Sequence, residues 1–254
     1  MASQPINVLG RISWMVTSVI SLLLVWWGAA FVIQSRYLPS PQEVFSVLAI
    51  ELASGELLFH VAMTLMRVAA SFTVAMVIGS AIGIAMGKQA WADRLFDGWL
   101  MFFLNLPALV TIVLCFIWFG LTEVATVLAV AINKIPNVAV TLREGTRALD
   151  PVYDQLAKAY RFSRWKALRH VLLPQLAPYF AAAARSGLAL VWKIVLVVEL
   201  LGRSNGVGFQ IHLYFQLFDV AAILAYAISF IVVVQLIETF ILQPWQQSVV
   251  RWRA

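Results

Sequence analysis

The chain alternates long apolar runs with short polar segments. A helix needs about 20 mostly apolar residues to cross a lipid bilayer. Each such run has to be helical, because lipid offers no partners to the backbone groups of an open strand. Six runs are long enough, at about 12–33, 61–86, 96–119, 122–142, 180–201 and 220–243. The pattern predicts an all-α, polytopic membrane protein with six transmembrane helices and a single domain over 1–254.

The segments inside and between the runs predict local features. Gly120, between the third and fourth runs, indicates a tight hairpin. The connection after the first run reads Leu38-Pro39-Ser40-Pro41 and continues as an amphipathic stretch, which predicts a short capped helix. Small residues recur every four positions in the second run, a spacing typical of close helix packing. They are Gly79, Gly83 and Gly87.

Composition narrows the class of protein. The chain is 62% apolar and 12% charged, whereas a soluble domain is about half apolar and about one quarter charged. A soluble enzyme, a disordered chain and a nucleic-acid-binding module are therefore excluded. The single cysteine, Cys115, forms neither an intramolecular disulfide nor a zinc site. We place the three histidines in or near loops, where their spacing predicts no metal site, and we expect no cofactor.

Lysines and arginines predict the orientation of the chain. With the N-terminus inside, twelve of them fall in inner segments and two, Arg36 and Arg203, in outer loops. Because basic loops remain in the cytoplasm, both termini are predicted to be cytoplasmic. The net charge of +6 follows mainly from this bias and requires no nucleic acid. The first run is expected to be kept as a membrane anchor rather than cleaved.

Residues 143–180 form a connection that is too long and too charged for a simple turn. They hold seven lysines and arginines. Asp150 followed by Pro151 predicts a helix start, and Ser163 is expected to cap a second short helix. From the residues alone, two interpretations stay open. The helices lie on the membrane with a basic face toward anionic lipid, or they dock a cytoplasmic partner.

This segment resembles the cytoplasmic loop of ABC-importer permeases of the binding-protein-dependent family. That loop reads approximately E-A-A-x-x-x-G, followed after about nine residues by I-x-L-P. Further matches to the nitrate/sulfonate/taurine branch lie at Leu38–Pro41, Glu199–Gly202 and Gly206–Phe209. In the loop, the residues that the resemblance assigns to coupling with an ATPase are Gln155, Leu156, Ala157, Tyr160, Arg161, Leu173 and Pro174.

One departure from the family pattern bears on this loop. Arg161 stands where the family has glycine, which permits a tight turn after the coupling helix. We expect an arginine to reach the turn differently or to extend the helix. Gln155 likewise replaces the family's glutamate.

The resemblance implies a non-catalytic subunit of the bacterial inner membrane. Its expected partners are two cytoplasmic ATPase subunits, a second permease copy in a homodimer, a periplasmic or lipid-anchored solute-binding protein, and membrane lipid. The solute is expected to be a small anion such as nitrate, a sulfonate, taurine or bicarbonate. The alternative is an aromatic or vitamin-precursor solute. The segment from Gly83 to Gln89 lacks the spacing of a phosphate-binding loop.

Two other functional classes are less well supported by the sequence. A secondary transporter usually shows repeated halves with broken helices, and the sequence has no such symmetry. A polytopic membrane enzyme such as an intramembrane protease needs a serine and a histidine in facing spans. The histidines are predicted at the margins of loops, which disfavours this class.

Polar groups inside a membrane are costly, and each is therefore a functional candidate. For Arg67, near the outer face, the alternative is snorkelling to the interface. For Lys134 we expect pairing with the carbonyl that Pro136 frees, and for Asn105 the alternative is a structural kink. Glu199 matches the family's E-x-x-G element, with a role in a gate or a dimer contact. The pathway or gate candidates are Arg67, Asn105, Lys134, Lys193 and Glu199.

Overall fold

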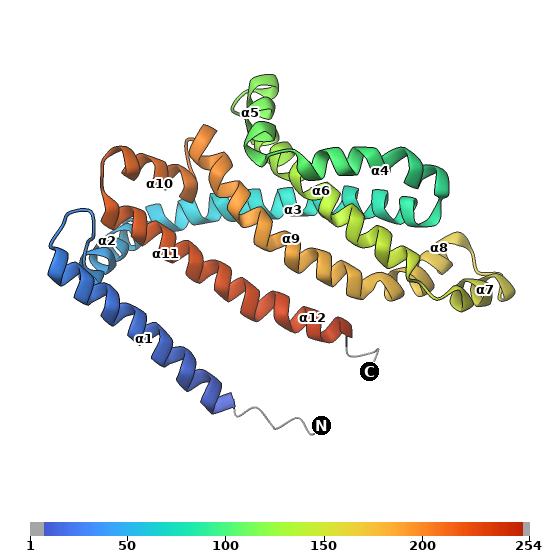
Figure 1. Ribbon diagram of the computed structural model, residues 1–254, viewed down its shortest axis with the longest axis horizontal. Helices are drawn as coiled ribbons and strands as arrows, with labels where there is room; N and C mark the ends of the chain where they lie inside the picture. Colours follow the sequence, from blue (N-terminus) through green and yellow to red (C-terminus); the bar gives the residue numbers. More distant parts are fainter. Residues whose placement is uncertain (1–7, 251–254) are drawn as a thin grey trace.

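The computed structural model describes residues 8–250, and every regular element in this range is helical. The predicted all-α class is confirmed. Figure 1 shows the helices in one elongated bundle. The helices are α1 (Val8–Ile33), α2 (Pro41–Ser54), α3 (Glu56–Lys88), α4 (Ala90–Asn105), α5 (Ala108–Phe119), α6 (Glu123–Arg147), α7 (Pro151–Ala159), α8 (Arg164–Ala167), α9 (Leu173–Gly202), α10 (Val207–Gln216), α11 (Val220–Ile237) and α12 (Gln243–Val250). Two π-helical turns, η1 (Leu168–Leu172) and η2 (Glu238–Leu242), precede α9 and α12.

Four helical segments within the described residues are long and apolar enough to cross a membrane. They are Glu56–Lys88, Glu123–Arg147, Trp165–Gly202 and Val220–Gln246. These segments contain the predicted runs 61–86, 180–201 and 220–243, and all of the run 122–142 except Thr122, which caps α6. A fifth is reached if the bent pair α4 and α5 is counted as one span. α1 contributes a shorter apolar stretch, Thr17–Ile33.

The prediction of one continuous span over 96–119 is wrong. α4 ends at Asn105, α5 begins at Ala108, and their axes differ in direction by 99°. Leu106 between them is extended, with φ −72° and ψ 123°. The cause is Pro107, because a proline disfavours the helical conformation of the residue before it. The kink expected here is present, and it is a full break of the helix.

The boundary of the predicted loop 143–180 also differs. A continuous helical segment of 38 residues runs from Trp165 to Gly202 and includes α8, η1 and α9. Pro174 does not interrupt it, because the chain passes through the π-helical turn η1 and keeps a helical backbone conformation at Leu172 and Leu173. Only the first part of the predicted loop, with α7, is separate from the span.

Close packing of α3, α6 and α9 forms the centre of the bundle. A Cβ added at Gly79 would lie 2.7 Å from Cβ of Val138, and one at Gly83 would lie 2.9 Å from Cβ of Leu142. The predicted small-residue face of the second run is therefore confirmed, and its partner is α6. A side chain on this face would push the two helices apart.

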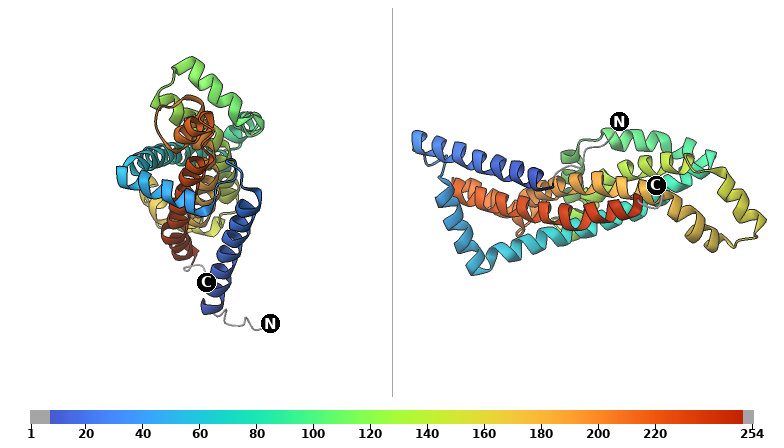
Figure 2. Two further views of the ribbon diagram at one scale, coloured as in Figure 1. Left: turned by 90° about the vertical axis from the view of Figure 1, so that its left-hand side faces the viewer. Right: turned by 90° about the horizontal axis from the view of Figure 1, so that it is seen from below.

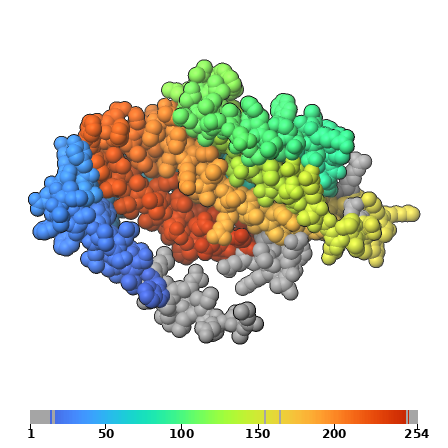
Figure 3. All heavy atoms as spheres, viewed as in Figure 1, coloured from blue at the N-terminus to red at the C-terminus, as the bar shows by residue number. Residues whose placement is uncertain are grey.

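The two ends of the bundle differ in what they carry. α2 and α10 lie at one end and α7 at the other in Figure 1, and the right-hand view of Figure 2 also shows α2 and α7 at opposite ends. We call them the α2 end and the α7 end. The segment around α7 projects from its end in the space-filling view (Figure 3). Arg143 of α6 bonds Asp97 of α4 at 2.6 Å and so ties α4 to α6 toward the α7 end.

The packing of α3 on α6 gives a first prediction. Gly83→Ala should lower the free energy of unfolding by about 1–3 kcal/mol, because the new methyl group overpacks the contact with Leu142. The matched control is Gly98→Ala in α4, where a Cβ meets nothing within 4 Å. That control should be neutral or stabilising by about 0.5–1 kcal/mol. Denaturant titration of the purified protein in micelles measures both, and equal effects would contradict the packing argument.

Candidate functional site

Arg67 and Glu199 lie in direct contact near the α2 end. Arg67 is 3% exposed, and its Nη1 donates to Glu199 Oε1 at 2.6 Å. Its Nε and Nη2 donate to the two carboxylate oxygens of Glu123 at 2.9 and 2.7 Å. Asn205 accepts through its backbone carbonyl and through its side chain. The alternative of snorkelling is wrong, because carboxylates from α6 and α9 supply partners inside the bundle.

Glu199 is completely buried, and both oxygens of its carboxylate accept hydrogen bonds. Its Oε2 accepts from the Thr64 hydroxyl and from the Gly208 N–H, both at 2.9 Å. A buried ion pair is tolerated when further hydrogen bonds satisfy its remaining lone pairs and protons. We call Arg67, Glu199, Glu123, Thr64 and Asn205 the Arg67 cluster.

Two glycines make room for this carboxylate. A Cβ at Gly206 would collide with the carboxylate of Glu199, and a Cβ at Gly208 would lie 2.8 Å from its Cβ. Gly206 also has φ +108°, a conformation that side chains rarely adopt. The sequence elements around Glu199 and around Gly206–Phe209, which the sequence analysis treats separately, thus pack directly against each other.

His60 extends the same polar region. The prediction that it lies in or beside a loop is wrong, because α3 begins at Glu56, earlier than the predicted span. His60 is 5% exposed, its Nδ1 accepts from the Gly206 N–H at 2.9 Å, and the Gln210 amide lies against Nε2 at 2.6 Å. Val207 N–H donates to the Thr64 hydroxyl at 2.8 Å. Three successive residues of the turn from α9 to α10 are therefore bonded to α3, namely Asn205, Gly206 and Val207.

A second polar contact joins α2 to α10 and α11. Glu51 accepts hydrogen bonds from the hydroxyls of Tyr214 at 3.0 Å and Tyr226 at 2.8 Å. Burial, together with the hydrogen bond to Glu51, raises the pKa of Tyr214 to about 12, so that its hydroxyl stays a donor. Sequence analysis did not single out these residues. Their separation of more than 160 positions leaves no local signal.

The other intramembrane candidates are not part of the Arg67 cluster. Lys134 is 2% exposed and packs against Gly187 of α9. Its expected bond to a carbonyl freed by Pro136 is not observed among the described residues. Lys193 is exposed on α9, and Asn105 ends α4, with its amide donating to the Met101 carbonyl at 2.7 Å.

The residues assigned to coupling lie at the α7 end. α7 begins as predicted, with Asp150 as N-cap accepting from the Val152 N–H at 2.9 Å. Leu156 is 52% and Tyr160 71% exposed, and Gln155 is exposed as well. Ala157 is 5% exposed and thus faces its own chain. α7 contacts η1, the turn directly before Leu173 and Pro174.

Arg161 takes the conformation of the glycine that it replaces. Its φ is +49°, Arg161 N–H donates to the Lys158 carbonyl at 3.0 Å, and Phe162 N–H donates to the Ala157 carbonyl at 2.9 Å. This pair of bonds is the Schellman motif that commonly ends helices. The expectation that arginine changes the turn or lengthens the helix is therefore wrong. The backbone bonds outweigh a left-handed strain of about 1–2 kcal/mol.

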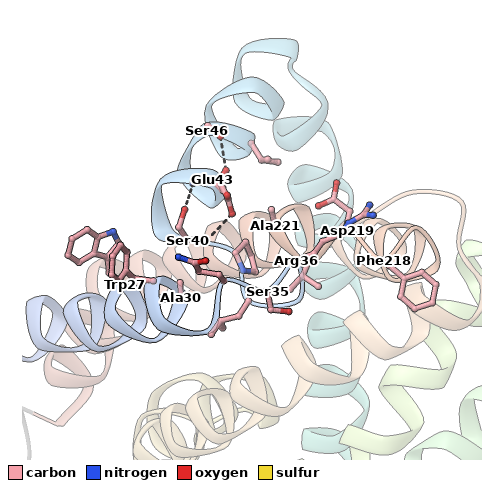
Figure 4. Close-up of a pocket in the computed structure, with 16 residues that line it drawn as sticks. Trp27, Ala30, Ser35, Arg36, Ser40, Glu43, Ser46, Phe218, Asp219 and Ala221 are labelled. Carbon is pink, nitrogen blue, oxygen red and sulfur yellow. Dashed lines mark hydrogen bonds between the residues drawn. The ribbon is translucent and has the colours of Figure 1, made fainter.

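Two cavities lie at opposite ends of the bundle. One of about 640 Å³ separates the start of α7 from η1, and Lys88 and Asp150 are the charged residues that line it. Another, of about 790 Å³, lies between the end of α1, the start of α2 and the start of α11. Figure 4 shows Arg36 and Asp219 on the same side of this second cavity, opposite the Ser40 and Glu43 pair that caps α2.

Comparisons with known proteins agree with this architecture. Residues 75–251 match the family model described as binding-protein-dependent transport system inner membrane component. SsuC of Bacillus subtilis (strain 168), named as an aliphatic sulfonates transport permease, is 27% identical over 91% of this chain and 84% of its own length. TauC of Escherichia coli (strain K12), a taurine transport system permease protein, is 27% identical over 91% and 86%.

A solved structure supports the same fold. A crystal structure of an amino acid ABC transporter with histidines matches at a TM-score of 0.61 and 20% identity. The match covers 79% of this chain and 97% of that one.

The burial of the Arg67 cluster generates a second prediction. Glu199→Gln should destabilise the protein by about 3–5 kcal/mol, because it removes one partner of a buried ion pair and leaves an amide among donors. Glu238→Gln is the control. It breaks the exposed pair with Arg185 at 3.2 Å and should cost less than about 1 kcal/mol. Unfolding midpoints in micelles test the difference, and similar losses would show that the cluster does not hold the fold.

The turn at Arg161 generates a third prediction. Arg161→Gly should stabilise the end of α7 by about 1 kcal/mol, since glycine adopts a positive φ without strain. The exchange of the Phe162 amide hydrogen should then slow by roughly fivefold. Ala159→Gly, two residues earlier and still helical, should have the opposite sign. Faster exchange in Arg161→Gly would refute the assignment of strain to this residue.

Proposed function

The chain belongs to the family of binding-protein-dependent transport system inner membrane components, and on that premise we propose that it forms the pathway for a small anionic solute. It is a non-catalytic membrane subunit of an ABC importer, and it acts with ATPase and solute-binding partners. Relatives named for aliphatic sulfonates and for taurine support an anion that carries a sulfonate group. The proposed substrate class is therefore small sulfonates.

The proposed membrane arrangement has six spans in one domain over 1–254. To the four long apolar segments it adds α1, which is 26 residues long, and the bent pair α4 and α5. Both termini and the α7 end are then cytoplasmic, and the α2 end faces outward. The distribution of lysine and arginine supports this orientation, because twelve of the eighteen lie in the inner segments and two in the outer loops.

We assign α7 and the turn after it as the coupling element that docks on an ATPase subunit. The observation that carries this assignment is an exposed apolar surface on a segment outside the long apolar helices. Exposed aromatic and aliphatic side chains next to cations are typical of interface anchors. This surface, which we call the α7 face, comprises Val152, Tyr153, Leu156 and Tyr160, each more than half exposed.

Among the residues named for coupling, the structure supports different roles. Leu156 and Tyr160 offer contact area, and Gln155 adds a polar edge. Ala157 and Arg161 instead shape the helix end through the Schellman bonds. Leu173 and Pro174, at the start of α9, follow the η1 turn that α7 contacts.

The Arg67 cluster is proposed to hold the outer end of each permease subunit closed around α3, α6, α9 and α10. In a homodimer with two ATPase subunits, movement at α7 reaches this end along the continuous helix Trp165–Gly202. The binding protein then releases its solute at the outer end. Arg67 and Glu199 act here as gate residues through their mutual contact.

The fourth prediction tests the coupling assignment. Leu156→Asp and Tyr160→Asp should each weaken co-purification of the ATPase subunit by at least about tenfold, because each removes an apolar anchor from the α7 face. Gln155→Glu is the matched control. It adds the same charge at a neighbouring exposed position, restores the family's residue and should leave binding unchanged.

Three further measurements complete this test. Solute-stimulated ATP hydrolysis should fall together with co-purification in both aspartate variants. Membrane insertion should remain normal, because the long apolar helices are untouched. Cross-links from positions 156 and 160 that reach only lipid would assign α7 to the membrane surface and overturn the docking proposal.

A further inference from the structure

Two lysines near the middle of the bundle have no counter-ion. Lys134 is 2% exposed in α6, and Lys193 is exposed on α9. Within residues 8–250, neither ammonium group has a hydrogen bond or an ion pair. Charged groups within the membrane are costly and usually face a partner or a water-filled path. Their uncompensated charge therefore points to a ligand rather than to a structural bond.

The neighbouring helices contain no acid that moves into contact easily. Residues 57–87 of α3, 124–143 of α6 and 173–198 of α9 include no aspartate or glutamate. The acids at the margins are already engaged. Glu199 and Glu123 bond Arg67, and Glu238 bonds Arg185 at 3.2 Å. The central part of these three helices is therefore positively charged.

A polar stripe runs along α6 beside Lys134. Asn133, Asn137 and Thr141 recur every four residues and so share one side of the helix. Each donates one hydrogen bond to the carbonyl four residues earlier, at 2.8, 3.4 and 2.9 Å. Each asparagine retains a second N–H and its carbonyl oxygen. Asn137 is exposed, and lipid cannot satisfy these groups.

The uncovered sides of α6 and α9 also support a ligand-binding surface. α3 packs against both helices, α4 and α5 cover the far flank of α6, and α10 and α12 contact α9. α11 also packs against α9, through Phe230 beside Trp192. The exposed residues of α6 and α9 mark the sides that remain open. On α9 that side bears Ala182, Ser186, Ala189 and Lys193, all exposed. We call this surface, together with the α6 stripe, the α6/α9 polar face.

Gly187 holds Lys134 at the seam between the two helices. A Cβ at position 187 would lie 2.5 Å from Cε of Lys134 and 3.1 Å from its Nζ. The lysine side chain thus occupies the volume that a side chain at 187 would take. Its ammonium lies against the buried side of α9, where Phe72 of α3 also borders position 187, with its Cε2 atom 3.6 Å from such a Cβ. Lys193 lies six residues further along α9, about 9 Å along the axis.

We propose that the α6/α9 polar face is an anion-binding section of the translocation pathway, with exposed Lys193 as the residue that pairs with the solute's anionic group and Lys134 as a buried positive charge behind the face. Asparagine N–H groups of the α6 stripe donate to the oxygen atoms of the anionic group. The ligand chemistry is a compact oxyanion such as a sulfonate, whose charge complements the two lysines. This inference rests on the proposed function, because it requires the face to line a path through the membrane.

Charge-selective labelling of introduced cysteines tests the inference without a known solute. In a Cys115→Ala background, Asn137→Cys and Ser186→Cys are expressed together with the ATPase partner in open membrane fragments. The probes are two methanethiosulfonate reagents, one bearing a sulfonate and one a trimethylammonium group. Each forms a mixed disulfide with the thiolate and releases methanesulfinate. Val77→Cys, 64% exposed on α3, is the matched control facing lipid.

Both test positions should react, and Val77→Cys should not. Relative to 2-mercaptoethanol, the rate ratio of sulfonate to trimethylammonium reagent should be raised at both positions. Adding Lys193→Met should lower that ratio on the order of tenfold, and Lys134→Met should act in the same direction. Lys88→Met, at the end of α3, should leave it unchanged.

Several results would overturn the inference. No reaction at either test position means that the face is not wetted. If neither methionine substitution changes the ratio of the sulfonate to the trimethylammonium labelling rate, the lysines do not attract anions. Gly187→Ala supplies a second check, because the added methyl group must displace Lys134 and shift the ratio. The readout here is the labelling ratio, whereas the coupling assignment is read from co-purification of the ATPase subunit, so failure here is distinguishable from failure of the coupling assignment.

Discussion

The Arg67 guanidinium is the contact on which the α2 end of the bundle depends. It lies 3% exposed and bonds Glu123 of α6, Glu199 of α9 and Asn205 of the turn into α10 at once. A charge buried at this depth has to be fully compensated, and that demand fixes the positions of its neighbours. Gly206 has no room for a side chain because the carboxylate of Glu199 fills the space beside it, and Gly208 has none because it packs against the backbone of α9 at Leu196 and against Cβ of Glu199. One cation thereby determines the geometry of three helices and a turn.

The two ends of the molecule are built on different physical principles. The α2 end relies on buried hydrogen bonds, with the Arg67 cluster and the Glu51 contact to two tyrosines holding six helices. The α7 end relies on exposed ion pairs such as Arg147 with Asp93 at 2.6 Å, which solvent screens. A rigid end and a yielding end suit a subunit that is pushed at one side by its ATPase partners.

Sequence patterns revealed the helices and the family but not how side chains meet. Apolar runs gave the long spans, Asp150 and Ser40 gave two helix starts, and the glycines at 79, 83 and 87 gave a packing face. The sequence predicts one continuous span across Pro107, because an apolar run shows that residues suit the membrane interior but does not show where the helix axis changes direction. The pairing of Arg67 with Glu199, 132 positions apart, has no local signal. Arg161 was misjudged because two backbone bonds, invisible in sequence, outweigh its strain.

The unbroken helix from Trp165 to Gly202 is longer than a bilayer is thick. At 1.5 Å per residue, its 38 residues span about 57 Å. A bilayer with its headgroups is about 40–45 Å thick. With its Gly202 end level with one set of headgroups, the helix stands roughly 12 Å clear of the other, and a tilt of about 20° leaves roughly 9 Å of that overhang. In the proposed membrane arrangement this overhang places α7 in the aqueous phase, within reach of a soluble protein.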